Sequence, residues 1–95
     1  MDWIKQLEEE DLMFLKRFVL ASGSLKELAD AYGISYPTVR LRLDRLIEKI
    51  KILDDQGITS AFERLLRVQY AEGKITIDTM KALLAAHRKE MEGRK

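Results

Sequence analysis

The chain of 95 residues contains no cysteine, one proline and one histidine, and its net charge is only +1. The absence of cysteine excludes a disulfide framework, a thiolate nucleophile and a cysteine-based zinc site. The N-terminus carries no basic and apolar leader, and no run is long and apolar enough to span a membrane. We therefore expect a cytoplasmic protein without a membrane partner.

Residues for catalysis or cofactor binding are equally scarce. The lone histidine, His87, lies in an apolar stripe with no second histidine, so a packing role is expected rather than metal ligation. Asp54 and Asp55 are adjacent in a predicted turn, where neighbouring side chains point apart. No glycine-rich phosphate loop and no nucleophile–base pattern occurs. We expect no enzyme activity, no cofactor, no metal and no small-molecule substrate.

The sequence does contain helical periodicity. Apolar residues recur at spacings of three and four along most of the chain, and no segment alternates as a strand does. Glycine, serine and proline interrupt this pattern at a few points, which predicts an all-α fold of about five helices. The helices that follow the first are predicted at about 24–32, 36–52, 58–72 and 77–92. Residues 2–7 are predicted to form an extra turn or an N-terminal brace.

Residues 24–47 fit a helix-turn-helix unit, which is a short helix, a turn containing glycine and a longer helix. Ala29 is small where the two helices would cross, and Gly33 supplies a turn conformation that other residues disfavour. Ile34 is expected to plug the core from the turn. Val39 is expected at the centre of the buried face of the second helix.

The charge distribution suggests nucleic acid as the partner. Residues 34–53 carry five basic and two acidic side chains, a balance of +3, although the whole chain is nearly neutral. A helix-turn-helix presents the N-terminal end of its second helix to base edges in the major groove. Arginine donates there to guanine or phosphate, and threonine contacts a base or a thymine methyl. The sequence therefore predicts a duplex-DNA-binding transcriptional regulator.

Eleven residues make up the predicted DNA interface. The residues predicted to read or grip the groove are Ser35, Tyr36, Thr38, Arg40 and Arg42. Those predicted to contact phosphate are Ser24, Lys26, Arg45 and Lys49. The interface also includes Pro37, which stiffens the first turn, and Leu41, whose side chain faces outward. The alternative is that the arginines form a solvated face, and that the helix-turn-helix is a scaffold for protein interaction or oligomerisation.

A family resemblance rests on ASGSLKELA at Ala21–Ala29 and on GISYPTVR with RLD at Gly33–Ile47. These phrases resemble the helix-turn-helix core of an uncharacterised bacterial family, domain of unknown function 2089. The unit is more distantly similar to region 4 of sigma factors and to the LuxR-type DNA-binding domain. The resemblance implies a bacterial, cytoplasmic regulator of transcription with Ser35–Arg42 at the DNA. Longer members carry a cysteine-rich, zinc-ribbon-like N-terminal segment, which this cysteine-free chain lacks.

The remaining residues predict a second unit. We place the helix-turn-helix unit at 1–53 and a two-helix hairpin at 54–95. The stretch EGKITIDTMKALLAAH resembles a small helical hairpin that serves bacterial proteins in oligomerisation or docking, with Thr76 as the expected cap. Its apolar side chains either fold back on the helix-turn-helix or pair with a second chain. A homodimer would suit a palindromic DNA site.

Overall fold

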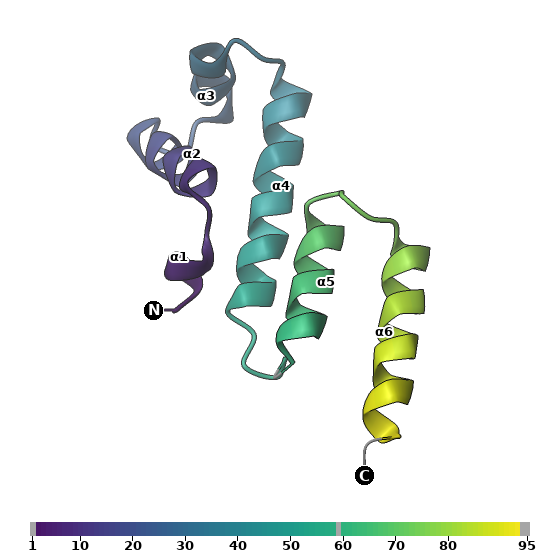
Figure 1. The fold of residues 1–95 in the computed structure, drawn as a ribbon. Helices are drawn as coiled ribbons and strands as arrows, with labels where there is room; N and C mark the ends of the chain where they lie inside the picture. Colours follow the sequence, from purple (N-terminus) through teal and green to yellow (C-terminus); the bar gives the residue numbers. More distant parts are fainter. Residues whose placement is uncertain (1, 59, 94–95) are drawn as a thin grey trace. The chain divides into compact units, whose positions relative to one another are not determined.

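The computed structural model describes residues 2–58 and 60–93. In this part of the chain it contains six helices and no strand, which confirms the predicted all-α class (Figure 1). The helices are α1 (Asp2–Gln6), α2 (Glu9–Leu20), α3 (Leu25–Tyr32), α4 (Tyr36–Leu53), α5 (Ala61–Ala71) and α6 (Ile77–Glu92). The short α1 is the extra turn that the sequence allowed at residues 2–7.

Capping side chains decide where most of these helices begin. The hydroxyls of Ser24, Ser35 and Thr76 each accept a backbone N–H three residues later, at 3.2, 3.3 and 3.1 Å. Each cap satisfies an amide that has no partner within the helix. The helix α5 begins later than predicted because Ser60 caps it by accepting the N–H of Glu63 at 3.3 Å.

The turn of the helix-turn-helix depends on one glycine. Gly33 ends α3 with φ of 66°, in the left-handed region, and nothing lies within 4 Å of a Cβ built there. Only the backbone conformation therefore requires glycine at this position. The next residue, Ile34, corrects an expectation: its side chain is 36% exposed and does not plug the core. Its N–H completes the end of α3 by donating to the carbonyl of Ala29 at 3.1 Å.

The chain forms two compact units, Met1–Ile47 and Glu48–Lys95, and the boundary between them falls within the sequence of α4. The sequence pattern predicts this boundary after residue 53, at the end of the helix. In the first unit the largest fully buried side chains are Phe14, Leu28 and Val39. In the second unit α5 packs against α6 through Leu66, Met80 and Leu84, with Ile75 beside them.

Replacing Leu28 by alanine tests the core of the first unit. Leu28 is 1% exposed, so L28A should lower the free energy of unfolding by about 3 kcal/mol through lost burial and the cavity left behind. The matched control is L20A, because Leu20 is 73% exposed and its truncation should cost less than about 0.5 kcal/mol. Urea unfolding followed by circular dichroism measures both. Equal effects of the two substitutions would contradict this core.

Candidate nucleic-acid interface

The candidate interface is the side of α4 that faces away from the core. Val39 is completely buried, and advancing about 100° per residue from it puts the opposite side of the helix in solvent. The structure confirms this exposure for the predicted residues of its first turns, which are Ser35, Tyr36, Pro37, Thr38, Arg40 and Leu41. Within the first unit, the outward side of the N-terminal half of α4 is therefore accessible to a binding partner.

The first turn of α4 is held in place by its own hydroxyl groups. The Oγ of Ser35 accepts the backbone N–H of Thr38 and lies 2.8 Å from the Oγ1 of Thr38. Since one hydroxyl donates to the other, one O–H of the pair remains to donate outward. Ser35 and Thr38 thus form a fixed polar pair at the N-terminal end of α4. In helix-turn-helix proteins, this end of the second helix enters the major groove.

Arg42 makes contacts that the sequence did not predict. Its Cζ lies 4.9 Å from the ring centroid of Phe14 and 5.3 Å from that of Tyr32. The rings of Phe14 and Tyr32 are stacked with their centroids 6.1 Å apart. The Cζ of Arg17 also lies 4.9 Å from the ring centroid of Tyr32. The guanidinium of Arg42 therefore contributes to holding α4 against α2 and α3 through cation–π attraction, while Arg42 remains exposed.

The burial of Lys49 corrects the prediction that this side chain contacts phosphate. Only 3% of this residue is exposed, and its Nζ lies 3.0 Å from a carboxylate oxygen of Glu72 within the second unit. A buried ammonium needs such a partner, because removing it from water unpaired is costly. The side chain is thus committed to packing and does not contact phosphate.

Two of the predicted cations remain available. Lys26 and Arg45 are exposed and have no ion-pair partner among residues 2–58 and 60–93. Arg40 pairs with Asp44 on the next turn, at 3.4 Å. Ser24 uses its hydroxyl oxygen to cap α3 and keeps its proton to donate. The positive charge of the interface is smaller than the sequence count suggested.

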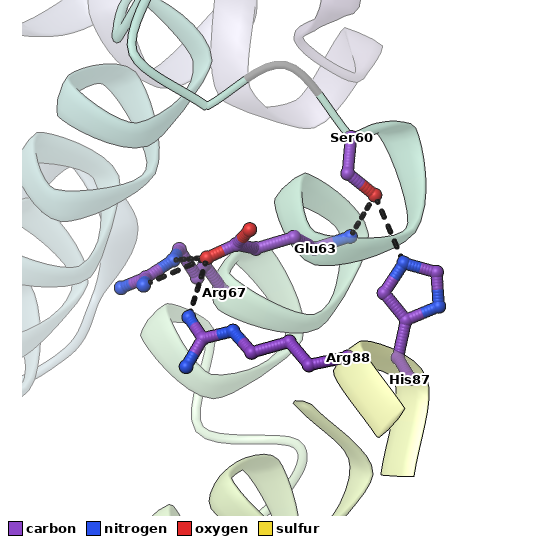
Figure 2. A network of polar contacts seen from close by, with 5 residues as sticks. All are labelled: Ser60, Glu63, Arg67, His87 and Arg88. Atoms are coloured by element: carbon purple, nitrogen blue, oxygen red, sulfur yellow. Dashed lines mark hydrogen bonds and ion pairs between the residues drawn. The ribbon is translucent and has the colours of Figure 1, made fainter. Parts of the chain in front are cut away.

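The polar residues between α5 and α6 form a separate network, which Figure 2 shows. The Nε2 of His87 lies 3.3 Å from the Oγ of Ser60, and its ring centroid lies 4.6 Å from that of Phe62. Glu63 directs its carboxylate to Arg67 at 3.0 Å and to Arg88 at 3.4 Å. The predicted packing role of His87 is confirmed, since the imidazole contacts a helix cap and an aromatic ring.

The comparison with known families bears directly on this geometry. Residues 7–53 match the family described as domain of unknown function (DUF2089)-HTH. Residues 7–53 belong to this family. The DUF2089 segment contains α2, α3 and α4, and with them all the residues predicted to contact DNA. No curated protein and no solved structure is significantly similar to the chain. In its described part, none of the helices combines the length and apolar character needed to cross a bilayer.

The position of Arg42 leads to a stability prediction. R42A should lower the free energy of unfolding by about 1 kcal/mol, because it removes a cation from two aromatic rings of the DUF2089 segment. R45A is the matched control and should change stability by less than about 0.5 kcal/mol, since Arg45 is exposed and pairs with no residue that the structure describes. Urea unfolding measures both. An R42A protein as stable as R45A would show that the ring contacts contribute nothing.

Glu63 leads to a prediction about acid stability. Hydrogen bonding from Arg67 holds the pKa of Glu63 below its ordinary value of 4.5, with a smaller contribution from Arg88, while burial opposes the shift. The carboxylate therefore stabilises the fold above pH 4.5, and this contribution is lost as the pH falls through the lower folded pKa. Melting temperatures between about pH 6 and pH 3 should fall less steeply for E63Q than for the unmodified chain. E92Q, at an exposed site on the same unit, should leave the steeper slope unchanged.

Proposed function

We propose that this protein binds duplex DNA through the N-terminal half of α4 and regulates transcription from the cytoplasm of a bacterium. The observation that carries the proposal is the DUF2089 helix-turn-helix match over α2–α4, in which this half of α4 is exposed. Ser35 and Thr38 present hydroxyls there, and Arg40 presents its guanidinium. These are groups that bond to base edges and phosphates.

Contacts to the DNA backbone come from fewer side chains than the sequence alone suggested. Lys26 and Arg45 are the cations free to neutralise phosphate, and Ser24 adds a hydroxyl donor at the start of α3. A small number of ionic contacts makes each copy of the protein a weak binder, because phosphate neutralisation supplies much of the affinity for DNA. Two copies on one duplex would compensate through effective concentration.

A homodimer is therefore part of the proposal, and we assign it to the hairpin. Phe62 and Leu65 on α5, and Leu83 and Met91 on α6, are exposed apolar side chains in the second unit. Contiguous exposed apolar side chains mark contact surfaces, and we propose that these four contribute to one. The same side chains favour the second candidate function, a protein-interaction module in which the helix-turn-helix is only a scaffold. In either case we propose a binding protein and not an enzyme.

Selection of bound duplexes from a random library at about 150 mM salt tests the DNA proposal. An enriched palindrome is expected, and its half-site spacing should match one turn of DNA. K26A and R45A should each weaken binding to the selected duplex and reduce the slope of log affinity against log salt by about 0.9. K81A, which removes an exposed lysine from α6, should change neither.

The outcomes separate the candidate functions. An enriched single half-site would contradict the homodimer and leave DNA binding in place. No enrichment, with weak binding that disappears as salt rises, would leave only non-specific attraction and favour the protein-interaction module.

A further inference from the structure

The ion pair on the outward side of α4 has a geometry suited to base recognition. Arg40 and Asp44 lie one turn apart, and their side chains are 54% and 50% exposed. From Val39 at the centre of the buried face, Arg40 lies at about 100° around the helix and Asp44 at about 140°. Asp44 thus draws the longer side chain toward the part of α4 that is farthest from the core.

The contact between Arg40 and Asp44 involves only one of the three guanidinium nitrogens. The carboxylate Oδ1 of Asp44 lies 3.4 Å from Nε of Arg40. No terminal nitrogen of Arg40 has a partner among the residues that the structure describes. A guanidinium whose Nε faces a carboxylate still has both terminal NH₂ groups available to donate. Those two groups have the spacing that matches the O6 and N7 acceptors of guanine in the major groove.

A second ion pair on α4 provides a comparison. Lys51 and Glu48 are also exposed neighbours, with Nζ and Oε1 3.3 Å apart. Exposed pairs like these contribute little to stability, so stability alone does not explain an acid at the outward face of a DNA-binding helix. The lysine ammonium is a point charge without a planar fork. Only the Arg40–Asp44 pair, in the N-terminal half of α4, is built for directional donation.

We infer that Arg40 reads a guanine in the major groove and that Asp44 is the positioning residue that orients its guanidinium. This inference rests on the proposed DNA-binding function and adds the base that is recognised. Asp44 acts on specificity through Arg40, and its own negative charge lowers affinity for DNA of any sequence. Removing the charge of Asp44 is therefore expected to reduce sequence specificity and to raise affinity for DNA of any sequence.

The test uses the full chain and the duplex selected by the unmodified protein. D44N should reduce the preference for one guanine over other bases at its position by about tenfold, while binding to unrelated duplexes becomes stronger. R40K, which keeps the charge without the fork, should lose the same preference. E48Q is the matched control, because it removes an acid from the same helix and should strengthen binding to all duplexes without changing the selected sequence.

Base analogues identify the atoms involved. Replacing that guanine by 7-deazaguanine removes the N7 acceptor and should weaken binding by the unmodified protein, but not by D44N. Hypoxanthine keeps O6 and N7 and should bind as guanine does. Thermal unfolding of each variant checks that the fold is retained.

The outcomes distinguish this inference from the function on which it rests. If D44N behaves like E48Q, with stronger binding everywhere and an unchanged selected sequence, Asp44 is only an exposed acid and the inference is wrong. An enriched sequence that lacks a guanine dependent on Arg40 also overturns it, while DNA binding stands. Failure of the unmodified protein to enrich any sequence contradicts the proposed function itself, and the inference with it.

Discussion

The burial of Val39 is the constraint on which the rest of the candidate interface depends. This side chain is completely inaccessible in the first unit, and it fixes the rotation of α4 about its own axis. Because side chains follow one another by about 100°, the same packing that buries Val39 turns Arg40, Leu41 and Asp44 outward. Gly33 makes this possible, since its left-handed conformation lets the chain leave α3 and enter α4 within a short turn.

Charge on α4 is divided between structure and binding. Arg42 lies against two aromatic rings of the first unit, and Lys49 is buried with Glu72 in the second. Arg40 and Lys51 each pair with an acid one turn away. Arg45 is the basic residue of α4 without a partner in the described part of the chain. We therefore propose that specificity comes from directed contacts and affinity from a second copy, with a smaller contribution from the phosphate backbone.

The helices and the outward residues of α4 were predictable because their causes are local. Serine, threonine and glycine at helix ends act within three or four residues, and the apolar stripe gives the rotation of each helix. The environments of Arg42 and Lys49 were not predictable in this way. They lie about 60° and 80° from Val39 around the helix, on its flanks, where a long side chain reaches either inward or outward. The direction depends on partners distant in sequence, which are Phe14 and Tyr32 for the arginine and Glu72 for the lysine.

We propose that the N-terminal half of α4 is the surface that binds DNA. The most direct measurement is a titration of the ¹⁵N-labelled protein with the selected duplex, followed through its amide resonances. We expect shifts concentrated between Ser35 and Arg45 and at the start of α3, with the amides at the centre of α6 unchanged. Shifts concentrated in α5 and α6, with α4 unaffected, would contradict it.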